Sequence, residues 1–278
     1  MSKLWLLAAV SLVACSGGET APEPKEPSAE QAQPKQMKKL NLNELIAAAE
    51  EVALVPSPAE MQKSLSNAGL SSKLSALVPA DRNIEMTVAD KDNLAVRTGV
   101  VLADLVLTVK SATKEEKVAR LKKLKAGFLT LGGGEDIQET IKDLINQVNN
   151  EAFSDDDLLK EMDELSGVMV PELEYEAGDW VVPLIQAGSW LEGANLVSSA
   201  IIKEEKFDTA SQLLRQPRVV EYFLKYVERE GREKAPDEVV KKLTEVLKSL
   251  QAIASKEKLG SDDVKSIQKS TSEVLSLL

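Results

Sequence analysis

Histidine is absent from this chain of 278 residues, and cysteine occurs only once, at Cys15. Without histidine there is no Ser-His-Asp or Cys-His catalytic system and no histidine-ligated haem. A single cysteine also excludes a disulfide within the chain and the usual zinc sites. We therefore expect no metal and no cofactor, and any chemistry must use Asp, Glu, Lys, Arg, Tyr, Ser or Thr.

Aromatic residues are scarce, at 4% of the chain, while apolar residues as a whole make up 43%. The apolar set is mainly Leu, Val, Ala and Ile, which suits helices packed on helices better than β-sheets, whose strands favour aromatic residues and Thr. The composition is also too apolar for a chain that is disordered throughout. We therefore expect a globular all-α protein, long enough for a sizeable core.

Basic residues are the minority among the charges: 34 Lys and Arg stand against 45 Asp and Glu, and the formal net charge is −11. No run of Lys or Arg interleaved with aromatic residues offsets this balance. Affinity for nucleic acid comes mainly from a basic surface that neutralises phosphates. The sequence therefore predicts no nucleic-acid partner.

The first residues of the chain combine a basic start with an apolar run. Lys3 precedes residues 4–13, which are apolar apart from Ser11. The run is too short to span a bilayer but has the length of the hydrophobic region of a signal peptide. It ends in Leu12-Val13-Ala14-Cys15, which resembles the lipobox of bacterial lipoproteins: an aliphatic residue, a tolerant position, a small residue and the cysteine that becomes lipidated.

The resemblance implies a signal peptide of residues 1–14 that is removed in front of Cys15. In bacterial lipoproteins the thiol carries a diacylglyceryl group and the new amine is commonly acylated, so the implied partner is a membrane, held through the N-terminal lipid. The next residue, Ser16, is not the aspartate that favours retention in the inner membrane of Gram-negative bacteria. The implied location is the cell envelope, on the outer membrane and facing the periplasm.

Residues 15–38 are rich in Gly, Pro, Glu, Gln and Ala and hold almost nothing apolar. Such a segment does not bury enough surface to order itself, so the sequence predicts a flexible tether. At about 3 Å per residue when extended, the tether lets the following domain stand up to ~60 Å from the lipid surface. We expect that domain to comprise residues 39–278.

Beyond about residue 39, apolar residues recur at spacings of three and four, which predicts amphipathic helices. Cap signals mark several helix starts, among them Thr113 with Glu116 three residues later. The pattern indicates a bundle of about ten helices. We expect them at 42–55, 58–68, 71–78, 88–111, 114–130, 135–151, 155–166, 179–203, 207–230 with a break at Pro217, 236–254, and from about 262 onwards.

Two of these helices are expected at the centre of the bundle, because residues 94–109 and 181–202 are apolar on nearly every side. Neither is expected to cross a membrane, since Arg97 and Asp104 interrupt the first and Pro183 the second. The remaining helices carry Lys and Glu on one side, which is typical of the outside of a bundle.

The two central helices align without a gap, with residues 97–102 over 186–191 and Gly99 over Gly188. A duplicated helical unit and a chance likeness of two core helices both explain this alignment. An irregular crossover is expected at 167–178. It is the best candidate boundary between two halves, residues 39–166 and 179–278.

Polar residues interrupt the two central helices, and with one tryptophan they form the candidate binding set. In the first helix they are spaced by seven and four, which places them along one stripe. A buried charge is costly unless it is paired, so we expect them to meet partners on the second helix or to line a polar cavity. An internal network that aligns the helices, a ligand-binding or catalytic cluster, and a stripe that faces water all stay open. The set is Arg97, Asp104, Thr108, Gln186, Trp190, Glu192 and Asn195.

Aromatic side chains gather near the second central helix, where Trp180 and Trp190 follow Tyr175. Such side chains line ligand pockets and stack on sugar rings or other flat apolar faces. The alternative is that the tryptophan rings fill space left by Gly188 and Gly193.

Two further motifs are interpreted as local structure. The run Gly132-Gly133-Gly134 precedes a helix as a phosphate loop would, but it lacks the Lys and Ser/Thr of such loops and is followed by acidic residues, so a turn between helices is expected. The acidic triplet at 155–157 lacks the alternating ligands and glycine of a calcium loop. Helix capping is its predicted role.

Taken together, these features favour a membrane-anchored envelope lipoprotein whose helical domain acts without catalysis. It is expected to bind a small ligand or to interact with an envelope protein. The alternative is a cell-wall or glycan-active enzyme that uses carboxylates, with Glu192 as its acid.

Overall fold

The structure is a computed structural model that describes residues 55–79, 84–234 and 237–278. The chain divides into two units, Met1–Asn41 and Leu42–Leu278, and all described residues belong to the second. In the described ranges every regular element is a helix, which confirms the expected all-α bundle. The predicted signal peptide, tether and most of the helix at 42–55 lie outside these ranges.

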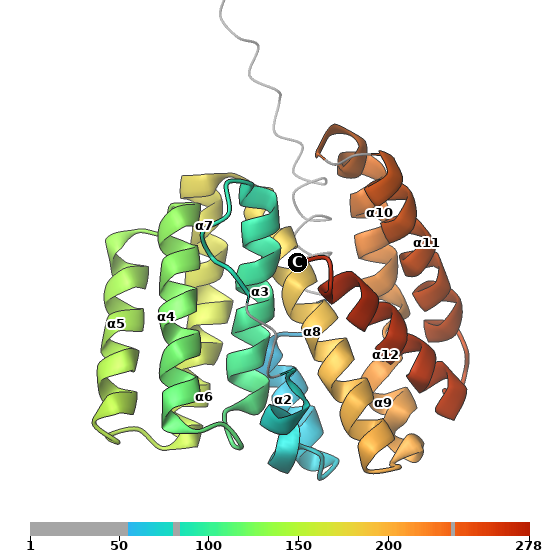
Figure 1. The fold of residues 1–278 in the computed structure, drawn as a ribbon, viewed down its shortest axis with the longest axis horizontal. Coiled ribbons are helices and arrows are strands. Elements are labelled where there is room, and N and C mark those ends of the chain that lie inside the picture. The colour runs from blue at the N-terminus through green and yellow to red at the C-terminus, as the bar shows by residue number, and fades with distance from the viewer. Residues whose placement is uncertain (1–54, 80–83, 235–236) are drawn as a thin grey trace, which may run out of the picture. The chain divides into compact units, whose positions relative to one another are not determined.

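The helices follow one another through short turns, and most begin or end within three residues of the predicted positions (Figure 1). Their bounds are α2 (Pro58–Asn67), η1 (Ser71–Leu77), α3 (Lys91–Thr108), α4 (Lys114–Leu131), α5 (Glu135–Asn149), α6 (Asp155–Glu164), η2 (Leu165–Met169), α7 (Val170–Ala177), α8 (Val181–Lys203), η3 (Phe207–Thr209), α9 (Ala210–Leu214), α10 (Pro217–Lys234), α11 (Asp237–Ala254) and α12 (Ser261–Leu275).

The helices form two groups around a central pair. In Figure 1, α4 to α7 lie to one side of α3, and α9 to α12 lie to the other side of α8. Helices α3 and α8 lie side by side in the middle and pack on each other more extensively than any other pair of described elements. The two helices predicted to be central from their apolar sequences are therefore the central ones.

The central pair crosses at two glycines that allow the backbones to touch. A Cβ atom at Gly99 would lie 1.9 Å from the carbonyl oxygen of Ile185, and one at Gly188 would lie 1.9 Å from that of Val96. The contact is reciprocal, because each glycine of the aligned pair abuts the backbone of the other helix. Ser189 adds a polar link, since its hydroxyl donates to the carbonyl oxygen of Gly99 at 2.9 Å.

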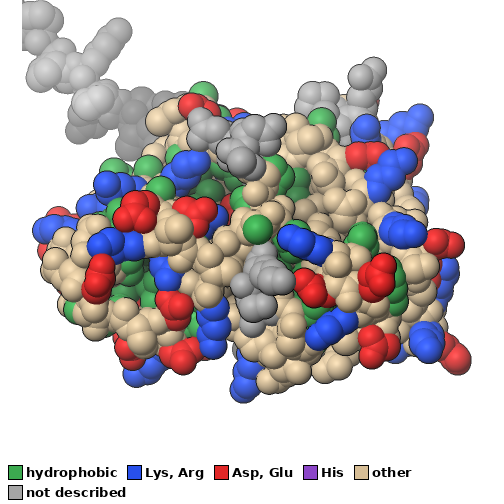
Figure 2. Space-filling model, turned by 60° about the horizontal axis from the view of Figure 1, so that its bottom comes forward, with side chains coloured by type: hydrophobic (Ala, Val, Ile, Leu, Met, Phe, Trp, Pro, Cys, Tyr) green, Lys and Arg blue, Asp and Glu red, His purple; other side chains and the backbone are tan. Residues whose placement is uncertain are grey.

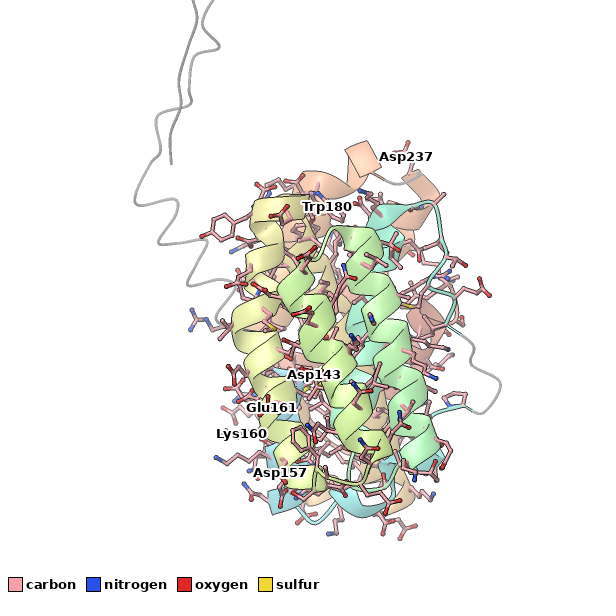
Figure 3. All side chains as sticks on the ribbon, turned by 90° about the vertical axis from the view of Figure 1, so that its left-hand side faces the viewer. Asp143, Asp157, Lys160, Glu161, Trp180 and Asp237 are labelled. Atoms are coloured by element: carbon pink, nitrogen blue, oxygen red, sulfur yellow. The ribbon has the colours of Figure 1, made fainter. Side chains whose placement is uncertain are left out.

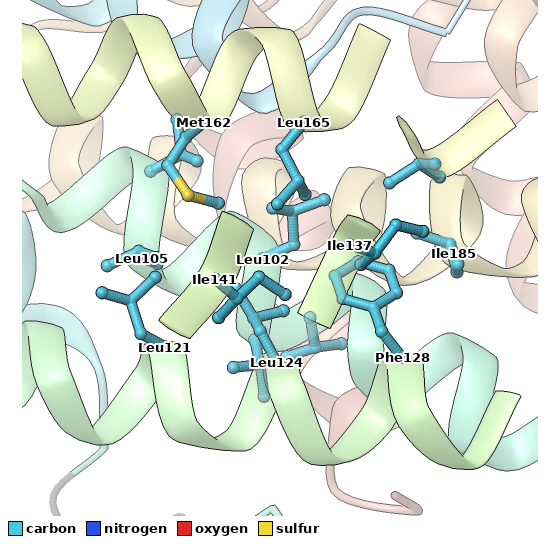
Figure 4. Close-up of a cluster of buried hydrophobic side chains, with 14 of the residues drawn as sticks. Leu102, Leu105, Leu121, Leu124, Phe128, Ile137, Ile141, Met162, Leu165 and Ile185 are labelled. Carbon is cyan, nitrogen blue, oxygen red and sulfur yellow. The ribbon is translucent and has the colours of Figure 1, made fainter. Parts of the chain in front are cut away.

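Two hydrophobic clusters flank the crossing, and both central helices supply side chains to each. The first cluster joins α3 to α4, α5 and α6, with Leu102, Leu124 and Ile141 among its buried members (Figure 4). The second joins α8 to α2, α9, α10, α11 and α12, and it includes Leu107 of α3 and Leu196 of α8. The outer helices turn their charges to solvent, as Figure 3 shows for Asp143 of α5 and Lys160 of α6.

The irregular crossover predicted for 167–178 is wrong, because the chain continues there as a helix. Helix α6 passes into the π-turn η2, where the N–H of Val170 donates to the carbonyl of Leu165, and then into α7, which ends at Gly178. Pro171 lies in the first turn of α7, where its missing N–H costs little. The wider π-turn accommodates the proline without breaking the helix. Segment 71–78 is also helical, but as the 3₁₀ helix η1.

No helix in the part of the chain that the structure describes has both the length and the apolar character needed to cross a membrane.

Candidate functional site

A cavity of about 550 Å³ opens between the two central helices and the second group. Its walls come from the start of α3, the first half of α8, the facing sides of α10 and α11, and the end of α12. We call it the aromatic pocket. Its defining residues are Leu184, Trp190, Phe223, Tyr226, Val227 and Leu243.

Three aromatic side chains form one wall of the pocket. The rings of Trp190 and Phe223 are 5.5 Å apart at an interplanar angle of 45°, and Tyr226 follows Phe223 on the same face of α10. The indole of Trp190 is held in place because its Nε1–H donates to Oε1 of Gln216 at 2.7 Å. The wall is therefore apolar, with its indole oriented by a hydrogen bond.

The hydroxyl of Tyr226 is buried in this wall. Burial raises the pKa of Tyr226, and the carboxylates of Glu230 and Asp92 raise it further, while the guanidinium of Arg229 acts in the opposite direction. Arg229 lies over the tyrosine ring at 5.8 Å from its centroid and pairs with Glu230 at 2.8 Å. The hydroxyl thus stays protonated in a negative environment.

Carboxylates also stand at the start of α3, where Asp90 and Asp92 line the pocket together with Asn93. Asp90 is the N-cap of the helix and accepts the backbone N–H of Asp92 at 3.0 Å. An acidic cap is favourable here because the positive end of the helix dipole lies at this terminus. The rim of the pocket is therefore acidic.

Of the candidate residues predicted from the sequence, only Trp190 lines the aromatic pocket. Arg97 is half-buried on α3, where Nε donates to Asn93 at 2.6 Å and Nη1 donates to the carbonyl oxygen of Glu85 at 2.9 Å. Its hydrogen bonds therefore run to its own helix and the preceding loop, and not to the second central helix.

The other two candidate residues of α3 are buried. Asp104 is 6% exposed and makes a polar interaction within the protein. The hydroxyl of Thr108 donates to the backbone carbonyl of Asp104 at 2.5 Å. Such a bond satisfies a buried hydroxyl within its own helix, so Thr108 needs no partner on α8.

On α8 the predicted residues face different neighbours. Asn195 donates from Nδ2 to the hydroxyl of Thr271 at 3.2 Å and to the carbonyl of Gln268 at 3.4 Å, both on α12. Glu192 is 0% exposed, whereas Gln186 is half-buried, and both make interactions within the protein. Asn195 thus joins α8 to α12.

The remaining aromatic residues of the prediction are spread apart. Tyr175 is 91% exposed on α7, and the indole N–H of Trp180 donates to the carbonyl of Ala177 at 2.8 Å. The suggestion that tryptophan rings fill the space beside Gly188 and Gly193 is wrong. That space is taken by the backbone of α3 and by the side chain of Met61.

The aromatic residues of α10 were not among the residues predicted for the site. Tyr222, Phe223 and Tyr226 fall within five residues of a chain in which only 4% of residues are aromatic. That concentration was the available signal. The helical period of α10 does not show that these aromatic residues face Trp190. The contact between α8 and α10 depends on packing between segments that are far apart in the sequence.

The two local motifs are turns and caps, as predicted. Gly132 ends α4 in the left-handed region with φ of 98°, and Gly134 is the N-cap of α5. Ser154 and Asp157 form a capping box at the start of α6, and hydrogen bonds from Ser154 lower the pKa of Asp157. Within the described ranges no group of three or more His, Cys, Asp or Glu is arranged to hold a metal ion.

Acidic and basic side chains are interspersed on the face shown in Figure 2, with small apolar areas between them. Exposed large apolar side chains include Leu129 on α4, Val168 on η2 and Tyr175 on α7. Comparison with protein-family models, curated proteins and solved structures finds no match for this chain.

Proposed function

We propose that this chain is a lipid-anchored protein of the bacterial envelope whose helical domain binds a small apolar molecule in the aromatic pocket. The observation that carries the ligand part is the pocket itself. Its volume of about 550 Å³ lies in the range of ~300–1,000 Å³ that is usual for small-molecule sites. Its walls join a hydrogen-bonded indole to apolar side chains of five helices.

The anchor part of the proposal depends on the lipobox resemblance at Leu12-Val13-Ala14-Cys15. Acyl chains on Cys15 attach the chain firmly, since each buried methylene contributes about 0.8 kcal/mol. The tether of residues 15–38 then carries the helical domain away from the lipid surface, at the outer membrane and towards the periplasm.

Binding of a small molecule is favoured over docking of an envelope protein by the distribution of apolar surface. The exposed large apolar side chains of the described residues are few, and scattered residues of this kind are normal on protein surfaces; they are Leu129, Val168, Tyr175 and Leu277. The aromatic pocket, by contrast, is a concave site with mostly apolar walls. Glu192, the acid of the enzyme alternative, is fully buried and does not line the pocket, so the proposal is non-catalytic.

The ligand part is tested by filling the pocket. Val227→Trp places a large ring inside it, whereas Val168→Trp adds the same ring at a position that is 56% exposed. We expect the apolar dye N-phenyl-1-naphthylamine to bind the unsubstituted protein and Val168→Trp, and to bind Val227→Trp at least tenfold more weakly. Equal binding by all three, with unchanged thermal unfolding, would remove the pocket from the proposal.

The anchor part is tested by Cys15→Ser in a Gram-negative host. The unsubstituted protein should sediment with outer-membrane vesicles, and its N-terminal peptide should carry the mass of acyl chains beginning at Cys15. The variant should lose both properties. A bare thiol on a chain that still holds residues 1–14 would contradict the anchor.

A further inference from the structure

The aromatic pocket runs along the helices that line it, because its residues come from successive turns of the same elements. On α10 they extend from Phe223 to Glu230, and on α11 from Val240 to Leu247. At a rise of about 1.5 Å per residue, each of these stretches covers about 10 Å of helix axis. The pocket is therefore about two helical turns long.

The two ends of the pocket differ. Its polar lining residues lie at the start of α3, where Asp90 is exposed, and near the end of α10, at Glu230. At the other end Trp190 is 5% exposed, and its ring lies 5.5 Å from that of Phe223. A molecule that enters at the polar end therefore reaches the indole of Trp190 last.

Behind Trp190 a smaller cavity of about 20 Å³ continues along the same three helices. We call it the inner hollow. Trp190 lines it too, together with residues that lie one or two turns further along each helix. These residues are Gly193, Ala194 and Val197 of α8, Val220 of α10, and Leu250 and Ala254 of α11. The indole thus separates two parts of one groove.

A hydrogen bond orients the indole across this groove. Its Nε1–H donates at 2.7 Å to Oε1 of Gln216, a residue of the turn between α9 and α10 that also lines the inner hollow. Turning the ring aside would break this bond and leave a buried N–H without its acceptor, which is costly. The position that closes the pocket is therefore the favoured one.

We propose that the ligand of the aromatic pocket carries an unbranched alkyl chain, and that Trp190 limits the length of that chain by closing the pocket in front of the inner hollow. This inference rests on the proposed function and adds the class of ligand and the residue that selects it. The polar head lies at the end near Asp90 and Glu230, and the chain lies along the apolar side chains of α10 and α11. Each methylene that is buried strengthens binding about fourfold, until the chain reaches the indole.

The test measures affinity against chain length with an uncharged head. The ligands are alkyl maltosides with tails of six to fourteen carbons, each below its micellar concentration, and binding is read from displacement of N-phenyl-1-naphthylamine. The protein is the chain from residue 15 carrying Cys15→Ser, which lacks the lipid and keeps every described residue. Its affinity should rise with each added methylene and then reach a plateau, because further carbons do not pass the indole.

Variants locate the limit. Trp190→Leu joins the pocket to the inner hollow, so the plateau should move to tails at least two carbons longer. The ratio of tetradecyl to hexyl affinity should then rise at least tenfold. Trp190→Phe is a smaller change and should move the plateau in the same direction, which keeps the test open if circular dichroism shows that Trp190→Leu does not fold. The matched control is Trp180→Leu, which removes an indole that does not line the pocket and should keep the original ratio.

The outcomes separate this inference from the proposed function. Three results would overturn the role of Trp190 while the apolar pocket stood: no plateau in the unsubstituted protein, an unchanged ratio in the folded Trp190 variants, or an equal rise in Trp180→Leu. Binding of the dye without displacement by any maltoside would overturn the alkyl chain alone. Binding of neither dye nor maltoside would overturn the proposed function as well.

Discussion

At the scale of single residues, two glycines control how closely the central helices approach. Gly99 and Gly188 each lie against a backbone carbonyl of the opposite helix, at a distance that leaves no room for a methyl group. Close approach of this kind shortens the separation between helix axes and makes the packing of every side chain near the crossing depend on it.

We expect Gly99→Ala and Gly188→Ala each to lower the free energy of unfolding by about 3 kcal/mol, the upper part of the range for overpacked cores. The added Cβ would meet backbone and not a flexible side chain, so the helices must separate. Urea denaturation measures the effect. The matched control is Gly167→Ala, where nothing lies within 4 Å of the new atom. That control should be neutral or slightly stabilising, and an equal loss in all three variants would refute the close contact.

The positions of the polar candidate residues were predictable from the sequence, but their hydrogen-bond partners were not. Arg97, Asp104 and Thr108 do fall on one stripe of α3, but the side chains of Arg97 and Thr108 find partners that the spacing did not indicate. Thr108 bonds to its own helix, Arg97 to the loop before it, and Asn195 to a helix far along the chain. Helical spacing specifies a face, whereas a hydrogen bond also requires the position of the partner.

At the scale of elements, acidic residues at the helix starts make the stability of the fold depend on pH. Asp263 in the first turn of α12 accepts the N–H of Gly260 at 2.9 Å and pairs with Lys256 at 2.5 Å. Its hydrogen bond with Lys256, followed by the backbone N–H of Gly260, lowers its pKa from the ordinary value of 3.8. This stabilisation is fully present above pH 3.8 and is lost as the pH falls through the lower value of the folded state.

Asp263→Asn should therefore reduce the free energy of unfolding near pH 7 and reduce it less near pH 2. The expected loss is about 0.2–1 kcal/mol, because Lys256 is largely exposed and salt screens the pair. Urea denaturation at both pH values measures the difference. Asp262→Asn removes the same charge from the same turn and keeps the contacts of Asp263. A pH-independent loss, or an equal effect of the control, would contradict this account.

Most helices were predictable because their signals are local. Caps such as Thr113 and Ser154 and the apolar spacing of each segment act within a few residues. The segment at 167–178 was not predicted, since Gly167 and Pro171 usually end a helix. There the burial of Val170 and Leu173 in the first cluster outweighs the local preference and keeps the chain helical through a π-turn.

At the scale of the whole molecule, the two hydrophobic clusters share their central helices. On α3, Leu105 belongs to the first cluster and Leu107 to the second, and on α8 the same holds for Ile185 and Leu196. Unfolding of one cluster therefore removes packing from the other. We expect the described helices to unfold as one cooperative unit.

The two tryptophans that follow the predicted signal peptide test this directly, because Trp180 packs on the first cluster and Trp190 lies in the second. In Trp190→Phe and Trp180→Phe variants, the remaining indole reports one cluster each. In each variant the urea transition of the remaining indole should coincide with the loss of helical circular dichroism. A fluorescence midpoint that differs from the circular dichroism midpoint of the same variant would show that the halves unfold independently.

By itself, the sequence determined the chemistry that this chain lacks, the helical class, the caps and the two apolar helices at the centre. These properties follow from composition and from interactions over one or two helical turns. Only the tertiary structure decided that Gly99 and Gly188 meet and that Phe223 and Tyr226 of α10 face Trp190. The reason is physical: the period of a helix specifies which face is apolar, but the partner of that face is selected by packing between segments far apart in the chain.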